Sequence, residues 1–149
     1  MGELHPVHIR TFNDTKRILI DVCDKERSVI AIDPGGWKTQ INSSVKFVCK
    51  RDITDLPIPN GKGDISLLGN YLNVNDHDLP LIIGWILYAL GGVKPYPILI
   101  LQGEQGSGKS TTSRVIRALV DPSSVPLRSP PREPKGLLVS AGNPRCRAG

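Results

Sequence analysis

Short apolar runs separated by charged turns dominate the first third of the chain. Residues 18–22 and 28–32 are two such runs, and residues 24–27 between them are all charged. Apolar positions recur with a period of two in a third run, at Val45, Phe47 and Cys49. A period of two is typical of strands with one buried face. We therefore expect a small antiparallel β unit over residues 1–51.

The middle of the chain predicts a connection followed by a helix. Residues 52–64 are rich in Pro and Gly, which indicates a linker and the internal boundary of the chain. A helix is expected from Asp78 as N-cap, with Pro80 tolerated in the first turn and Gly91 and Gly92 as the stop. Its core-facing side chains are expected to be Leu81, Ile82, Trp85, Ile86 and Leu90.

A different pattern begins at Pro95. Residues 96–101 form a continuous apolar run, which is typical of a strand buried on both faces of a parallel sheet. A glycine-rich turn follows, and residues 110–120 then read as a helix that ends at Asp121. The apolar face of this second helix comprises Val115, Ile116, Leu119 and Val120.

The glycine-rich turn carries the clearest chemical signal. Residues 103–110 (GEQGSGKS) fit the pattern G-x-x-x-x-G-K-[ST] at every fixed position. Glycines allow positive φ, so such a loop can direct successive backbone N–H groups at one anion, beside the positive end of the following helix. The expected nucleotide-binding residues are Gly103, Glu104, Gln105, Gly106, Ser107, Gly108, Lys109, Ser110 and Thr111.

The motif also assigns roles to individual side chains and thereby a fold class. Lys109 would act on the β- and γ-phosphates of ATP as the catalytic lysine, and the Ser110 hydroxyl would bind Mg²⁺. Thr111 would contact the α-phosphate. We therefore expect an α/β fold: a partial P-loop NTPase core (strand–P-loop–helix) within residues 65–149, preceded by a helix and the small antiparallel β unit.

A P-loop binds nucleotide, whereas hydrolysis needs a second carboxylate near the metal. Asp121 follows Ser110 by 11 residues, which places it about 16 Å along the helix. Glu133 lies in a proline-rich loop, and Asp21 and Asp33 end runs that we assign to the β unit. The expected catalytic carboxylate is missing, so we predict nucleotide binding with poor hydrolysis.

Charge is distributed unevenly along the chain. The net charge is +5, and residues 112–149 contain 7 basic and 2 acidic residues, whereas residues 1–111 are balanced. A basic end can attract nucleic acid or keep a tail soluble. The longest apolar stretch, residues 79–93, is shorter than the roughly 20 residues that cross a bilayer. No membrane association is expected.

Cysteine and histidine usage points to a reducing cytoplasm and to no metal site. The three cysteines Cys23, Cys49 and Cys146 are odd in number and form no CxxC pair, which argues against a zinc knuckle and a secreted disulfide framework. His5 and His8 have metal-like spacing, but nothing nearby in the sequence completes a site.

The sequence around the loop resembles bacterial and phage-associated P-loop ATPases that are similar to phage and plasmid primase–helicases. Residues 95–112 carry the resemblance most specifically, and residues 125–132, 36–37 and 45–47 fit the same pattern. The resemblance implies ATP binding, ATP-driven work on DNA, and self-association in a full-length parent. Only the P-loop residues match the family's motif position by position, so only their roles are assigned from the resemblance.

The end of the sequence departs from that family. Members continue into a strand with the second acidic motif. In this chain, residues 136–143 resemble the start of that continuation, but residues 144–149 do not continue it. We therefore expect a product truncated by a frameshift or an early stop. Two alternatives stay open: a small P-loop kinase, although 102 residues precede Gly103, and a non-functional remnant.

Overall fold

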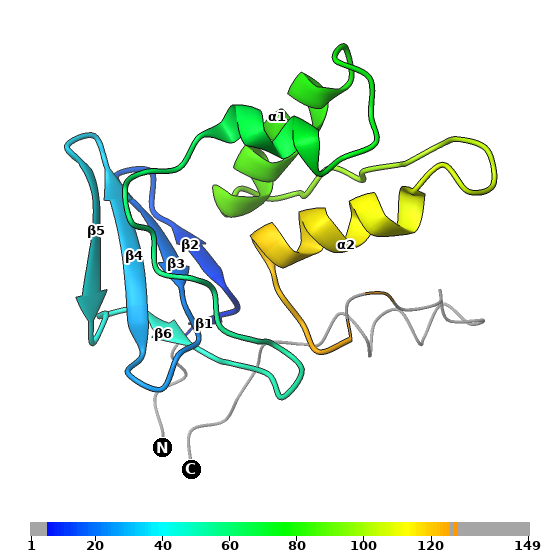
Figure 1. Cartoon of the computed structure of the whole chain (residues 1–149). Coiled ribbons are helices and arrows are strands. Elements are labelled where there is room, and N and C mark those ends of the chain that lie inside the picture. Colours follow the sequence, from blue (N-terminus) through cyan, green and yellow to red (C-terminus); the bar gives the residue numbers. More distant parts are fainter. Residues whose placement is uncertain (1–5, 126, 128–149) are drawn as a thin grey trace.

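A strongly bent sheet and a pair of helices face each other in this structure (Figure 1). The computed structural model describes residues 6–125 and residue 127. One sheet is antiparallel, in the order β2 (Thr11–Asn13), β3 (Ile18–Asp21), β4 (Ser28–Asp33) and β5 (Gly36–Ile41). The remaining elements are a parallel pair of β1 (Val7–His8) with β6 (Lys46–Phe47), a 3₁₀ helix η1 (Ile65–Asn70), α1 (Leu79–Leu90) and α2 (Lys109–Val120).

The two central strands confirm the expectation from the apolar runs. β3 and β4 pair antiparallel, with Leu19 opposite Ala31 and Ile20 opposite Ile30. All four of these side chains are buried, because alternate residues point to opposite faces and both faces are covered. One face packs on Phe47 and its neighbours, and the other on residues of the connection.

The outer strands were only partly expected. The alternating run at residues 45–49 yields the two-residue strand β6, and β1, β2 and β5 are additional. β5 follows the turn at Asp33 and runs antiparallel to β4, placing Trp37 opposite Ile32. Short edge strands depend on pairing with a neighbour, so the local sequence pattern predicts them weakly.

Both predicted helices are present, with one correction to the buried face of α1. Ile82, Ile86 and Ala89 are its buried residues, whereas Leu81 is 69% exposed. These three positions recur at helical spacing, and Leu81 lies on another face of the helix.

Within the described residues no helix combines the length and the apolar character needed to cross a bilayer, since α1 and α2 have 12 residues each.

The helices share one apolar core. Its buried members come from the 3₁₀ helix, the turn after it and both α-helices: Leu68, Leu72, Ile82, Ile86 and Ile116. α2 therefore packs along α1 through the middle of its length, with its first turn at one end of this core and its last turn directed at the sheet (Figure 1).

The expectation that residues 96–101 form a buried strand is wrong for this structure. The segment has no strand hydrogen bonds, and Ile98 and Ile100 are 88% and 71% exposed. A strand buried on both faces needs paired neighbours, and no strand of the described residues lies beside this one. It passes the helices as extended chain instead, where Trp85 Nε1 donates a hydrogen bond of 2.8 Å to the Pro97 carbonyl.

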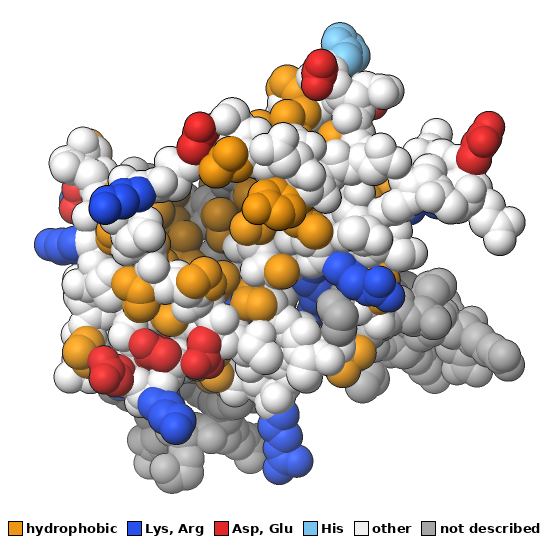
Figure 2. Space-filling view, viewed as in Figure 1, with side chains coloured by type: hydrophobic (Ala, Val, Ile, Leu, Met, Phe, Trp, Pro, Cys, Tyr) orange, Lys and Arg blue, Asp and Glu red, His pale blue; other side chains and the backbone are white. Residues whose placement is uncertain are grey.

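An apolar cavity of about 460 Å³ opens between the sheet and the last turns of the helices. Ile30 and Trp37 line it from the sheet, Pro57 from the connection, and Leu90 and Leu119 from the helices. Figure 2 shows the corresponding gathering of hydrophobic side chains at this junction. The cavity thus lies between the two halves of the molecule, and Leu90 of α1 packs against the sheet beside it.

The connection predicted at residues 52–64 is hydrogen-bonded to both halves. Leu56 N–H donates to the Val22 carbonyl of the sheet side at 2.9 Å. Thr54 N–H donates to the Pro122 carbonyl, just after α2, at 3.0 Å. Leu56 is also buried against the sheet, so this segment is part of the packed structure.

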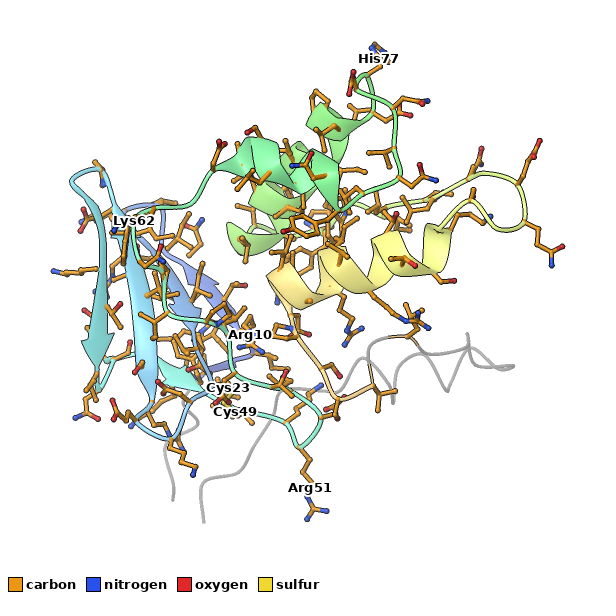
Figure 3. The ribbon with its side chains drawn as sticks, viewed as in Figure 1. Arg10, Cys23, Cys49, Arg51, Lys62 and His77 are labelled. Atoms are coloured by element: carbon orange, nitrogen blue, oxygen red, sulfur yellow. A yellow bond between two sulfur atoms is a disulfide. The ribbon has the colours of Figure 1, made fainter. Side chains whose placement is uncertain are left out.

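Arg10, which is 5% exposed, joins the same three parts through its guanidinium group. Its Nε donates to Asp121 Oδ1 at the end of α2, at 3.1 Å. Nη1 donates to the carbonyls of Asp21 and Val22, at 2.9 and 3.2 Å, and Nη2 donates to the Thr54 carbonyl at 2.9 Å. Figure 3 shows Arg10 between the sheet and the end of α2. Charged hydrogen bonds of this kind are the strong ones in proteins.

The structure contains one disulfide, although the cysteine count argued against a disulfide framework. Cys23, just after β3, is bonded to Cys49, just after β6, across a sequence separation of 26 residues. Their Cα atoms are 5.9 Å apart, within the usual range for a disulfide. The odd number of cysteines could not exclude this pair, because pairing depends on strand placement. Cys146 lies outside the described residues.

We predict that Arg10→Met lowers the free energy of unfolding by about 3–5 kcal/mol, because one buried cation holds a carboxylate and three carbonyls that would lose their donors. Urea unfolding measures this change. Arg17→Met is the matched control: Arg17 pairs with Asp14 at the surface, at 3.2 Å, and its loss should cost less than about 1 kcal/mol. Equal losses in the two variants would show that Arg10 does not hold the junction.

Candidate phosphate-binding site

The loop between the extended segment and α2 has a backbone that requires glycine at several positions. Gly103, Gly106 and Gly108 have φ values of 158°, 86° and 78°. L-residues with a side chain rarely adopt such values, whereas glycine does so without a steric penalty. The loop therefore turns back on itself over residues 103–108 and enters α2 directly at Lys109.

The start of α2 presents helix N–H groups without a side-chain cap. Gly108 is the N-cap residue, and no side chain accepts a hydrogen bond at this end. The first intrahelical bond runs from Thr112 N–H to the Gly108 carbonyl, at 2.9 Å. The first N–H groups of a helix lack intrahelical acceptors and carry the positive end of the helix dipole, which favours an anion there.

Lys109 spans the mouth of this loop. Its Nζ atom donates to the Gly103 carbonyl at 2.9 Å, to the Glu104 carbonyl, and to Ser107 Oγ at 3.2 Å. The ammonium group is therefore held over the turn that the three glycines make. An anion bound by the loop would lie next to this cation.

Asn73 supports the loop from outside the motif. Its Nδ2 atom donates to the Ser107 carbonyl at 3.0 Å, and its Cβ lies 3.6 Å from the position that a Cβ on Gly108 would occupy. Asn73 lies between η1 and α1, 34 residues before Ser107 in the sequence. Sequence reasoning missed this residue, because no local pattern connects it to the loop.

All nine predicted binding residues lie in the described part of the chain. Gly103 to Gly108 form the turn, and Lys109, Ser110 and Thr111 form the first turn of α2. Lys109 and Ser110 also line an open groove of about 810 Å³ along α2. Other side chains along this groove are Trp85, Leu101, Ser113 and Arg117. The structure thus brings the predicted residues together at the end of a groove.

The carboxylates considered for the metal have other partners. Asp121 accepts from Arg10 at 3.1 Å and pairs with Arg117 at 3.7 Å, at the end of α2 opposite to the loop. Asp33 Oδ1 accepts from the Gly35 N–H at 2.8 Å and closes the turn before β5. Glu133 lies outside the described residues.

Two further candidates belong to the β unit. Asp21 is buried beside the disulfide, and burial raises the pKa of its carboxyl group. His8 lies edge-on to Phe12, with ring centroids 4.7 Å apart, and burial followed by the charge of Lys94 lowers the pKa of its imidazole. His5 lies outside the described residues. His8 thus packs against the rings of Phe12 and Phe47.

A comparison with known protein families gives a match over the second half of the chain. The model of a family described as actinomycete integrative conjugative element replication protein matches residues 65–144, which is more than half of the chain. The matched span begins with η1 and includes both helices and the loop. No curated protein and no solved structure matches the chain.

We predict that Gly108→Ala lowers the stability of the protein by about 1–2 kcal/mol, because alanine at a φ of 78° is strained. Gly84→Ala in the middle of α1 is the matched control. A Cβ at Gly84 meets nothing within 4 Å, so alanine should stabilise that helix by about 0.5–1 kcal/mol. Thermal unfolding of the two variants gives the comparison, and stabilisation by both substitutions would contradict the loop geometry.

Proposed function

The chain belongs to the family of actinomycete integrative conjugative element replication proteins, and from this premise we propose that residues 103–111 form a P-loop that binds ATP with Mg²⁺. Family membership supports a role in the replication of a mobile element. The finer proposal is a nucleotide-binding component of the primase–helicase type, built on the glycine-rich loop and α2 without the expected strand before them.

The position of Lys109 is the observation that carries this proposal. Its ammonium group crosses the mouth of a loop whose three glycines have positive φ, directly before a helix without a side-chain cap. Two sources of positive potential thus lie close together: the lysine and the helix end. Polyphosphate is the biological ligand class that best matches such a concentration of positive charge in a backbone turn.

Ser110 fits the metal part of the proposal. It follows Lys109 in the first turn of α2 and is exposed on the groove. Mg²⁺ keeps several water ligands and is bound by few protein atoms together with substrate phosphates, so one hydroxyl at this position is an adequate protein contribution. When bound, Mg²⁺ would neutralise charge on the phosphates.

The proposal is that the chain binds ATP; hydrolysis of ATP would need a further residue. Asp121 is held by Arg10 at the far end of α2, so it is occupied in the junction rather than near Ser110. A carboxylate from elsewhere would have to orient water for hydrolysis. DNA is the proposed partner, supported by the family of replication proteins and by the 7 basic against 2 acidic residues of positions 112–149.

Titration of a fluorescent ATP analogue in the presence of Mg²⁺ tests the proposal. We expect saturable binding to the full chain and a loss of about 10- to 100-fold in affinity for Lys109→Ala, because hydrogen bonds to a charged group contribute about 1.5–3 kcal/mol. Ser110→Ala should reduce the dependence of binding on Mg²⁺. Lys62→Ala is the matched control, since Lys62 lies at the sheet end of the molecule, away from the loop (Figure 3).

The proposal fails if the wild-type chain shows no saturable binding or if Lys109→Ala binds as tightly as Lys62→Ala. ATPase activity stimulated by single-stranded DNA in the wild type would extend the proposal from binding to turnover.

A further inference from the structure

Three side chains with metal-ligating atoms meet at one end of the sheet. They are Asp21 at the end of β3, Cys23 two residues later, and Cys49 two residues after β6. One carboxylate oxygen and the two sulfur atoms all lie within 4.8 Å of one another. Figure 3 shows the two cysteines side by side, below the strands from which they come. All three residues lie outside residues 65–144, which the family model matches.

The backbone holds these groups in place. Asp21 is 3% exposed, its N–H donates to the Arg10 carbonyl at 2.7 Å, and its carbonyl accepts from Arg10 Nη1 at 2.9 Å. Cys23 has a φ of 65°, which turns the chain back so that its N–H faces Asp21 Oδ1 at 3.4 Å. Asp21 Oδ2 lies 3.3 Å from Cys49 Sγ. A buried carboxylate is thus directed at the sulfur pair from a fixed position.

We propose that, once the Cys23–Cys49 disulfide is reduced, Cys23, Cys49 and Asp21 bind one thiophilic divalent cation of the Zn²⁺ class. A dithiol reductant supplies two electrons and two protons, which cleave the S–S bond into two thiols while the reductant forms its own disulfide. Binding of the cation then releases both thiol protons. The same two cysteines therefore form a covalent bond when oxidised and a metal site when reduced.

The geometry of the backbone suits both states. Zinc binds thiolate at about 2.3 Å, so two sulfur atoms on a tetrahedral ion are about 3.8 Å apart. Cα atoms 5.9 Å apart allow this separation by rotation of the two side chains, with the strands left where they are. Cys49 is exposed and Cys23 is half-buried, so an ion can enter from solvent and water can take the fourth position.

Ligand type and charge decide which ion is preferred. Two thiolates with one carboxylate favour zinc or cobalt over magnesium and calcium, which prefer oxygen ligands. Three anionic ligands around a divalent ion leave one net negative charge. Arg10 and Arg27 are cations whose charge acts on Asp21, and they offset this excess, whereas Asp24 adds to it. Arg27 also lines, with Asp21, a polar cavity of about 290 Å³.

Titration of Co²⁺ into the reduced full chain tests the proposal, after the reductant has been removed under nitrogen. We expect one ion per chain, a thiolate-to-cobalt charge-transfer band, and the visible absorption of a tetrahedral site. Zn²⁺ should displace the cobalt and abolish both features. The oxidised chain, assayed in parallel, should show no such bands. Near-ultraviolet circular dichroism of the reduced chain before addition of metal reports whether its fold persists.

Single substitutions identify the ligands. Cys23→Ser and Asp21→Asn should each weaken Co²⁺ binding by at least about tenfold, and Cys23→Ser should also reduce the charge-transfer intensity by about half. Cys146→Ser is the matched control and should leave affinity and spectrum unchanged. If Asp21→Asn does not fold, Asp21→Glu, which keeps the carboxylate, replaces it and should retain the bands with altered affinity.

Several outcomes would overturn the inference. They are the absence of the charge-transfer band in the reduced wild type, retention of full affinity by Cys23→Ser, loss of the bands in Cys146→Ser, and equal cobalt binding by the oxidised and reduced chains. The first of these would leave the pair as a disulfide only.

Discussion

The buried guanidinium group of Arg10 is the interaction on which the arrangement of this molecule depends. A buried cation is costly unless its donors are paired, and this one reaches a carboxylate and three carbonyls that come from the sheet, the connection and the end of α2. These contacts tie the end of α2 to the sheet and to the connection. Beside an apolar cavity in the same junction, Asn13 Nδ2 donates to the Gly91 carbonyl at 2.7 Å and Leu90 packs against the sheet. Arg10 and the hydrogen-bonded connection therefore share the attachment with these contacts.

Fixing one end of α2 has consequences at its other end. The helix is a rigid rod of 12 residues whose last turn is held through Asp121 and whose middle packs on α1 through Ile116. Its first turn therefore has a defined position, where Asn73 also holds the loop through the Ser107 carbonyl. The candidate phosphate site is thus supported from two sides by residues that do not belong to the motif. Such preorganisation favours binding of an anion, since little has to be ordered when the anion arrives.

The sequence predicted the features that local patterns encode and missed those that depend on distant contacts. Strands β3 and β4, helices α1 and α2, and the glycine-rich turn before α2 all follow from periodicity, turn residues and glycine spacing. Residues 96–101 have the composition of a buried strand, but burial of a strand requires neighbours that the local sequence cannot supply. Arg10 and Asp121 are 111 residues apart, and the cysteine pair depends on where β3 and β6 end. No local pattern contains that information.

Binding of nucleotide phosphate at the start of α2 is the central claim, and backbone amide NMR tests it most directly. Addition of Mg²⁺ and ATP to the ¹⁵N-labelled chain is predicted to shift the amide signals of Gly106, Gly108, Lys109 and Ser110 strongly, because their N–H groups would turn to phosphate oxygens. Amides of β3 and β4 should change little. Shifts confined to the sheet or to the apolar cavity, or no shifts at millimolar ATP, would contradict the account.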